Sequence, residues 1–212
     1  MQTIAVIDYG SGNLRSVERA LLQAAANANR RREVRVTADA DFISRADRIV
    51  LPGQGAFADC MAGLRAIDGL IPVLEDRVRK HGTPFLGICV GMQLLGDKGL
   101  EREETPGLGW IGGECRVLDP HAGTLPHMGW NEARVMHAHP VFAALGEAAH
   151  MYFAHSFILD LSEPNDAACR TVHGEAFASA VARDNILGVQ FHPEKSQAFG
   201  LALLARFVDW TP

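Results

Sequence analysis

The stretch PFLGICVGMQ at residues 84–93 places a cysteine between two glycines, at the point where an apolar run gives way to a helical pattern. This arrangement is typical of a nucleophile elbow, in which a sharp strand-to-helix turn exposes one side chain at the top of a sheet. Gly87 and Gly91 remove the Cβ atoms that would clash in so tight a turn. Amides at the start of the new helix favour the thiolate of Cys89. The alternative is a buried structural cysteine, since free cysteines are among the most buried residues.

A second stretch, GVQFHPEKS at residues 188–196, favours the reactive interpretation of Cys89. It runs from an apolar strand into a polar turn, and Pro193 fixes the backbone between His192 and Glu194. A cysteine nucleophile needs an imidazole to accept its proton, and the imidazole needs a third group to hold its orientation. We therefore predict a catalytic triad of Cys89, His192 and Glu194, although the last two, each taken alone, are typical of a surface loop.

Around the elbow, strands and helices alternate, which predicts a mostly parallel central sheet with helices on both faces. The expected strands are 3–8, 33–37, 47–51 and 84–88, and the expected helices are 14–27, 57–66, 70–81 and the elbow helix. From Gly107 onward, turn residues break the chain into short strands, which predicts an antiparallel β region built onto the same sheet. These strands are expected near 109–117, 131–136, 150–158, 168–173 and 177–190, with a hairpin turn at Asp184-Asn185 and a final helix at 197–209. We expect a single α/β domain over residues 1–212.

Composition narrows the functional classes. The formal net charge of −5 argues against a nucleic-acid-binding protein. The one basic cluster, Arg30-Arg31-Arg32, is followed by Glu33, so we expect a solvated helix end or loop there. No segment has the apolar length of a membrane span, and the first residues lack the features of a signal peptide. Four cysteines form no C-x-x-C pair, so we expect no disulfides and a cytoplasmic protein.

A metal site is not expected. His137 and His139 are close in sequence, but no third ligand accompanies them at a suitable spacing. The loop Gly10-Ser11-Gly12-Asn13 matches neither the dinucleotide-binding nor the Walker pattern, so it does not indicate a nucleotide site. We therefore expect the protein to need no cofactor.

The elbow and the FHPE segment at 191–194 make the chain resemble the class I (triad-type) glutamine amidotransferases, which have a flavodoxin-like fold. More narrowly, the chain resembles the glutaminase subunits of imidazole glycerol phosphate synthases, which serve histidine biosynthesis. The narrower resemblance rests on blocks from one end of the chain to the other: DYGSGNL at 8–14, LPGQGAF at 51–57, HMGWN at 127–131, YFAHS at 152–156 and HPEKS at 192–196. It implies hydrolysis of L-glutamine to glutamate and ammonia through a thioester on the cysteine.

A tetrahedral intermediate at the cysteine needs hydrogen-bond donors for its oxyanion. We expect one donor to be the amide of Val90, the residue after the nucleophile. The other is expected from the segment Gly53-Gln54-Gly55, whose glycines let backbone amides approach a reacting carbonyl. A plain turn is the alternative for this segment. Gln54 stands where the family more often has a small apolar residue, so the resting conformation of the loop is left open.

Gln93 lies one helical turn past the cysteine and on the same face. The resemblance implies that Gln93 binds glutamine, that Glu101 meets its α-ammonium group, and that Ser156 and Phe157 contact its α-carboxylate through backbone groups. An exposed or capping role is the alternative for each. That alternative is strongest for Glu101, because other glutamates follow it closely.

Ammonia released into water becomes ammonium near neutral pH and stops being a nucleophile. The resemblance therefore implies an enclosed path to a partner, a (β/α)-barrel cyclase that converts phosphoribulosyl-formimino aminoimidazole carboxamide ribotide (PRFAR) into imidazole glycerol phosphate and AICAR. The residues that it implies at the partner interface are Asn13, Met128, Trp130, Asn131 and Lys195. A buried core position is the alternative for Trp130, and a solvated lysine for Lys195.

Two other functional classes stay open at this point. One is a hydrolase that acts alone on γ-glutamyl compounds with the same triad. Such a hydrolase would turn over its substrate at full rate without a partner, whereas a glutaminase subunit would be weakly active until its cyclase and the cyclase ligand are added. The other is a non-catalytic regulatory or scaffold protein on the same fold, which would tolerate the loss of Cys89.

Overall fold

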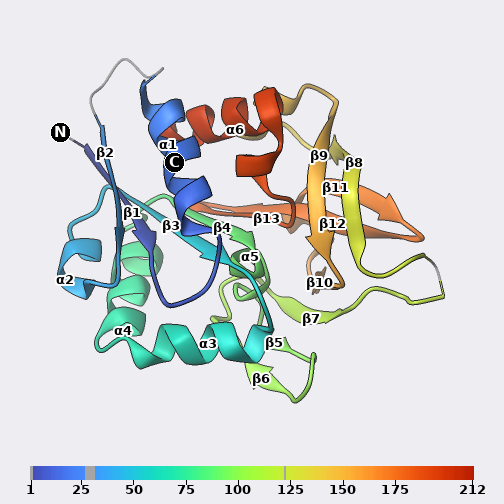
Figure 1. Ribbon diagram of the computed structural model, residues 1–212, viewed down its shortest axis with the longest axis horizontal. Coiled ribbons are helices and arrows are strands. Elements are labelled where there is room, and N and C mark those ends of the chain that lie inside the picture. Colours follow the sequence, from blue (N-terminus) through green and yellow to red (C-terminus); the bar gives the residue numbers. More distant parts are fainter. Residues whose placement is uncertain (1, 27–31, 122) are drawn as a thin grey trace.

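The computed structural model describes residues 2–26, 32–121 and 123–212. Its main sheet has the strand order β2-β1-β3-β4-β13-β12-β11-β8-β9 (Figure 1). Five neighbouring strands pair in parallel: β1 Gln2–Ile7, β2 Arg32–Thr37, β3 Arg48–Gly53, β4 Phe85–Cys89 and β13 Ile186–Val189. The parallel sheet that the alternating pattern predicts is therefore confirmed.

The rest of the main sheet is antiparallel. It consists of β8 His127–Val135, β9 Ala148–His155, β11 Ala167–His173 and β12 Glu175–Arg183. Strand β12 also pairs with β13, and Asp184 between them has a φ of 52°, which confirms the predicted hairpin turn. The antiparallel region thus extends the parallel sheet, as expected.

A second sheet corrects one expectation. It has the order β10-β7-β5-β6 and is formed by β5 Lys98–Gly99, β6 Thr105–Pro106, β7 Gly113–Val117 and β10 Phe157–Leu161. The expected strand at 109–117 therefore does not join the main sheet, and the expected strand at 150–158 is really two strands. The chain changes sheets at Ser156, because residues up to His155 pair with β8 and residues from Phe157 pair with β7. No glycine, proline or asparagine marks this exchange in the sequence.

Helices cover both faces of the main sheet (Figure 1). Helices α1 Leu14–Ala26 and α6 Gln197–Asp209 pack against each other on one face, whereas α3 Phe57–Ala66 and α4 Leu70–Leu74 lie on the other. Helix α4 continues into a π-helical segment, Glu75–Lys80, so the expected helix near 70–81 is present with a wider last part. Short 3-10 turns occur at Phe142–Leu145, Pro164–Asp166 and Pro193–Lys195.

The sequence does not predict helix α2, Ala40–Ile43. The Asp39 carboxylate accepts hydrogen bonds from the amides of Asp41 and Phe42, which satisfies the exposed donors at this helix start. The expectation for the basic cluster is also wrong in part. Arg30 and Arg31 lie outside the described residues, but Arg32 begins β2, and its side chain is only 2% exposed and pairs with Asp209 at 2.7 Å.

The apolar core is one continuous cluster of buried residues. Strands β3 and β4 are buried at every position, which is typical of parallel strands covered on both faces. They end at the same edge of the sheet, where Gly53 is the register partner of Cys89. The elbow therefore follows two strands that are buried along their whole length. Among the described residues, no helix is both long and apolar enough to cross a membrane.

Candidate active site

Cys89 sits on a sharp turn between strand β4 and helix α5, Val90–Gln93. Its backbone has a φ of 56° and a ψ of −113°, a conformation that costs a non-glycine residue about 1–3 kcal/mol. The flanking glycines are needed for close approach. A Cβ on Gly87 would lie 2.4 Å from the carbonyl oxygen of Gly91, and a Cβ on Gly91 would lie 1.9 Å from that of Leu51. The predicted nucleophile elbow is therefore present.

Helix α5 is a single turn, shorter than the sequence pattern indicates. Few aligned peptide groups contribute to its dipole, so the helix can favour a thiolate only weakly. The imidazole of His192 is hydrogen-bonded to the Cys89 side chain.

His192 follows β13 and is held by its backbone, because its N–H donates to the Tyr152 carbonyl oxygen at 2.8 Å. Its Nδ1 lies 2.9 Å from Glu194 Oε1, and the two side chains are 8% and 1% exposed. Burial lowers the pKa of His192, but its hydrogen bonds with Cys89 and Glu194 outweigh this and raise the pKa to about 9. The structure thus brings the three predicted triad residues together, in the order thiol, imidazole, carboxylate.

The cavity above Cys89 has a volume of about 120 Å³. It gathers most of the residues that the sequence assigns to catalysis and to glutamine binding. Its lining consists of Gln54, Gly55, Cys89, Val90, Gln93, Glu101, Ala154, His155, Ser156, Phe157, His192 and Lys195. Glu194 lies behind His192, and Gly53 lies within β3 beside the elbow.

In the segment expected to supply an oxyanion donor, both backbone groups of Gln54 are hydrogen-bonded to Ser11. The Gln54 amide donates to the Ser11 hydroxyl oxygen at 3.1 Å, and the Ser11 hydroxyl donates back to the Gln54 carbonyl oxygen. Just before this point, the buried Tyr9 hydroxyl donates to the Pro52 carbonyl oxygen at 2.7 Å. In this conformation the Gln54 amide is therefore not available to an oxyanion. The sequence gives no role to Ser11 or Tyr9 beyond the motif that contains them.

Gln93 is fixed by two hydrogen bonds from its Nε2 atom, one to the Phe157 carbonyl oxygen at 2.9 Å and one to Gln190 Oε1 at 3.1 Å. Gln190 Nε2 in turn donates to the Cys89 sulfur at 3.8 Å. The sequence analysis misses Gln190. Its signal is a single amide side chain inside the apolar run GVQF, where a buried polar group needs a partner.

Glu101 lines the cavity, but its carboxylate also has a structural partner. Its Oε2 accepts a hydrogen bond from the Phe57 amide at 2.8 Å, at the start of helix α3. The capping role considered as an alternative is therefore present. It holds Glu101 at the cavity wall, because α3 is anchored in the core.

The expected interface residues lie outside this cavity, apart from Lys195. Met128 and Trp130 are 65% and 48% exposed on β8, so the buried position considered for Trp130 is wrong. The Lys195 ammonium lies 5.7 Å from the ring centre of Tyr152, and the Trp130 ring packs edge-on against the same tyrosine. Asn13 is exposed just before helix α1.

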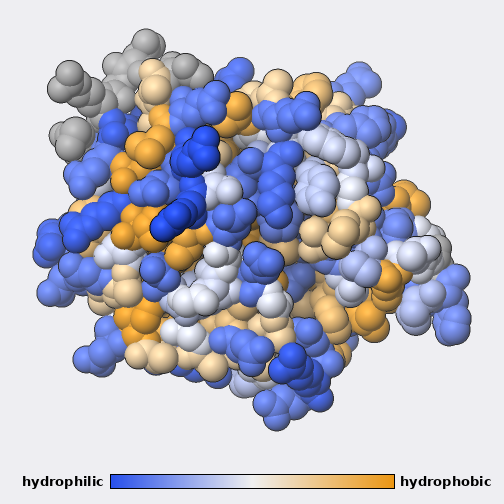
Figure 2. Space-filling view, in the orientation of Figure 1, coloured by the Kyte–Doolittle hydropathy of each residue, from blue (hydrophilic) through white to orange (hydrophobic). Residues whose placement is uncertain are grey.

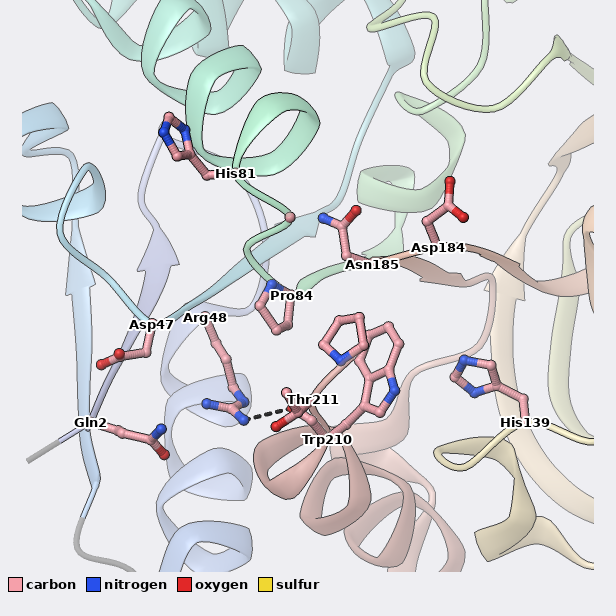
Figure 3. A pocket seen from close by; sticks show the side chains of 12 residues that line it. Gln2, Asp47, Arg48, His81, Pro84, His139, Asp184, Asn185, Trp210 and Thr211 are labelled. Carbon is pink, nitrogen blue, oxygen red and sulfur yellow. Dashed lines mark hydrogen bonds between the residues drawn. The ribbon is translucent and has the colours of Figure 1, made fainter.

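Another cavity, larger than the one above Cys89, lies elsewhere and has a volume of about 720 Å³ (Figure 3). It lies where β1 and β3 begin, at Gln2 and Arg48. Trp210 also lines it, and the Trp210 carbonyl oxygen accepts a hydrogen bond from Arg48 at 2.7 Å (Figure 3). Ligands of open α/β sheets bind at the carboxyl ends of the strands, the opposite edge. None of the predicted site residues lines this cavity, so its size does not locate the chemistry.

Histidine residues do not assemble a metal site in the described part of the chain. No group of three or more His, Cys, Asp or Glu side chains is placed there to hold an ion. His139, one of the two histidines considered above, accepts a hydrogen bond from the Val141 amide at 3.2 Å and packs against Trp210.

Known proteins are similar to this chain over its whole length. The family described as "Glutamine amidotransferase class-I" matches residues 5–210. The chain is 53% identical over 214 residues to the imidazole glycerol phosphate synthase subunit HisH of Caulobacter vibrioides, with 100% of both chains covered. It is 51% identical over 213 residues to the subunit of the same name from Zymomonas mobilis, with 99% of this chain and 97% of that one covered.

A solved structure is similar in fold. The glutaminase domain of Trypanosoma brucei CTPS with bound acivicin superposes with a TM-score of 0.68 at 15% identity, covering 100% of this chain and 96% of that one. At this identity the likeness shows the fold alone.

The close contact at the elbow predicts a stability difference between two glycines. Gly91→Ala places a Cβ against the Leu51 carbonyl oxygen, whereas a Cβ on Gly112 meets nothing nearer than 3.6 Å. We expect Gly91→Ala to lower the free energy of unfolding by about 3 kcal/mol or more, and the control Gly112→Ala to change it by less than about 1 kcal/mol. Urea denaturation measures both, and equal losses would contradict the proposed contact.

The contacts of His192 predict an unusual titration. Its raised pKa of about 9 means that the protonated ring stabilises the fold fully below pH ~6.5 and that this contribution is lost as pH rises through about 9. Glu194→Gln removes the carboxylate charge, so we expect the pKa of His192 to fall. NMR titration of the imidazole carbons measures the midpoint in both proteins, and an unchanged midpoint in the variant would contradict the pairing.

Proposed function

Because the chain belongs to the class I glutamine amidotransferases, we propose that it is the glutaminase subunit of an imidazole glycerol phosphate synthase. It hydrolyses L-glutamine to glutamate and ammonia, and it passes the ammonia to a cyclase subunit in histidine biosynthesis. The observation that carries this proposal is the buried, hydrogen-bonded set of Cys89, His192 and Glu194 at the elbow. The full-length identity to two HisH subunits supports the choice of pathway.

The proposed reaction uses each member of the triad once per half-reaction. The Cys89 thiolate attacks the side-chain amide carbon of glutamine, and the His192 imidazolium donates a proton to the departing ammonia. Water, deprotonated by His192, then hydrolyses the γ-glutamyl thioester to glutamate and frees the thiol. Glu194 holds the imidazole in one orientation and stabilises its charged form.

The oxyanion of the tetrahedral intermediate needs two donors. We propose the Val90 amide as one and an amide of Gly53-Gln54-Gly55 as the other. Since the Gln54 amide is bonded to the Ser11 hydroxyl, its use in catalysis requires that this bond break. A protein at rest in this conformation should therefore release little ammonia, which suits an enzyme whose product is wasted without a partner.

Glutamine is proposed to lie in the 120 Å³ cavity, with its amide over the sulfur. Gln93, Glu101, Ser156 and Phe157 all line this cavity, so groups that suit a carboxylate and a group that suits an ammonium are both available. The negative charge of Glu101 suits the α-ammonium group, and backbone groups of the Ser156–Phe157 turn suit the α-carboxylate.

The partner is proposed to be a (β/α)-barrel cyclase that converts PRFAR into imidazole glycerol phosphate and AICAR. We propose that its docking face on this chain includes the exposed apolar side chains of Met128 and Trp130, together with Asn131, the exposed Asn13 and Lys195, which lines the cavity. Figure 2 shows apolar residues interrupting the polar surface on the side of the molecule that carries β8 and β11. A cytoplasmic location stays a prediction from the sequence.

Glutamate release tests this function directly. We expect the purified chain to hydrolyse glutamine slowly, and to do so at least about tenfold faster when a matching cyclase and its ribotide ligand are added. Cys89→Ala should abolish release in both cases, because no nucleophile remains, while the complex with the cyclase still forms.

Two outcomes would contradict the proposal. Full activity without the cyclase would instead identify a hydrolase that acts alone on γ-glutamyl compounds. Undiminished support of histidine synthesis in cells carrying Cys89→Ala would identify a non-catalytic protein.

A further inference from the structure

Two buried histidines of the predicted motifs form a chain of hydrogen bonds that ends at the glutamine cavity. Asn131 Nδ2 lies 3.1 Å from His127 Nε2, and His127 Nδ1 lies 2.9 Å from His155 Nε2. His155 Nδ1 lies 3.0 Å from the Phe157 carbonyl oxygen. The rings of His127 and His155 are 4% and 6% exposed, so water does not replace these partners. We call Asn131, His127 and His155 the imidazole chain.

The Phe157 carbonyl oxygen, at one end of the imidazole chain, determines which ring nitrogen of each histidine carries the hydrogen. A carbonyl oxygen only accepts, so His155 must carry its hydrogen on Nδ1, and its Nε2 is then an acceptor. His127 must therefore donate from Nδ1, which leaves its Nε2 to accept from the Asn131 amide group. Burial and the neighbouring imidazoles support these neutral rings, because they lower the pKa of His127 to about 4 and that of His155 to about 3.

The imidazole chain ends at the Phe157 carbonyl oxygen, which also holds a residue of the glutamine cavity, Gln93. The Phe157 carbonyl oxygen accepts a hydrogen bond from His155 Nδ1 and another from Gln93 Nε2. His155, Ser156 and Phe157 all line the cavity. The polypeptide crosses from the main sheet to the second sheet at Ser156. The Ser156 carbonyl oxygen accepts a backbone hydrogen bond from the Leu118 amide at 2.9 Å, and the His155 side chain adds a second restraint at the Phe157 carbonyl oxygen.

We infer that His155 is a positioning residue for glutamine binding, through the hydrogen bond from its Nδ1 to the Phe157 carbonyl oxygen. This bond orients the Ser156–Phe157 turn and the Gln93 amide toward the substrate. His127 acts one step further away, because its Nδ1–H donates to His155 Nε2 and so helps to hold the ring in place. The inference rests on the proposed glutaminase function, and it assigns His155 and His127 to binding rather than to proton transfer at Cys89.

Two substitutions of one residue separate these hydrogen bonds. In His155→Asn the side-chain amide reaches the place of Nδ1, so it keeps the donor to Phe157 and loses the acceptor for His127. In His155→Gln it reaches the place of Nε2, so it keeps the acceptor and loses the donor. In the complex with the cyclase, we expect His155→Gln to raise the KM for glutamine about tenfold and His155→Asn about threefold or less, since one hydrogen bond is worth about a factor of ten. The kcat of both should stay within about threefold of the parent value.

Thermal unfolding serves as the control for a merely structural role, because both variants lose one ring and one buried bond. Similar Tm losses with different KM values support positioning. Equal KM increases in the two variants, or a loss of kcat at unchanged KM, would overturn the inference. If the parent complex itself releases no glutamate, the proposed function fails instead, so the two failures are distinguishable.

A second measurement needs no variant of His155. Nitrogen-15 NMR of the ring nitrogens distinguishes the two neutral tautomers, and the structure requires hydrogen on Nδ1 in both His127 and His155. In His127→Phe, which keeps an aromatic ring against Phe153 and His173, His155 loses the donor to its Nε2 but keeps its Phe157 acceptor, so the KM for glutamine should rise less than in His155→Gln. An Nε2–H tautomer of His155 in the parent protein would overturn the inference by itself.

Discussion

The site depends on how closely the elbow approaches strand β3. The backbone at residue 91 passes so near the Leu51 carbonyl oxygen that a Cβ there would lie 1.9 Å away. This contact lets β4 turn sharply at Cys89, and the cysteine takes up the strain with a φ of 56°. Because β3 and β4 are buried at every position, the surrounding core outweighs that strain and holds the sulfur in one place.

The segments that carry the other functional groups, His192 and Gln54, differ in how firmly they are held. His192 is tied by its backbone to Tyr152 and by its ring to Glu194, so the base of the triad is preorganised. The Gln54 amide, in contrast, is held by one side-chain hydrogen bond, to the Ser11 hydroxyl oxygen. The triad is thus preorganised, whereas the Gln54 amide must leave Ser11 before it can stabilise an oxyanion.

Much of this could be predicted from the sequence, because local patterns encode it. The elbow glycines, the rigid His-Pro-Glu turn and the alternation of strands and helices each have a short-range physical cause. What the sequence could not supply depends on pairing between distant segments. The exchange of sheets at Ser156 has no turn residue to mark it, and Gln190, Ser11 and Tyr9 gain their roles only through partners about 40 to 100 positions away. For the same reason, the sequence predicts the capping role of Glu101, which accepts a hydrogen bond from the distant Phe57 amide, only as an alternative.

The central claim is that Cys89 is the nucleophile and that His192 activates it. A diazoketone analogue of glutamine tests this most directly, because it alkylates a thiolate held at the glutamine site. Peptide mass mapping of the treated complex should find the label on Cys89, and His192→Ala should slow labelling at least about a hundredfold, the usual contribution of a positioned base. Labelling of Cys60, Cys115 or Cys169 instead, or of Cys89 at an unchanged rate in the variant, would contradict the account.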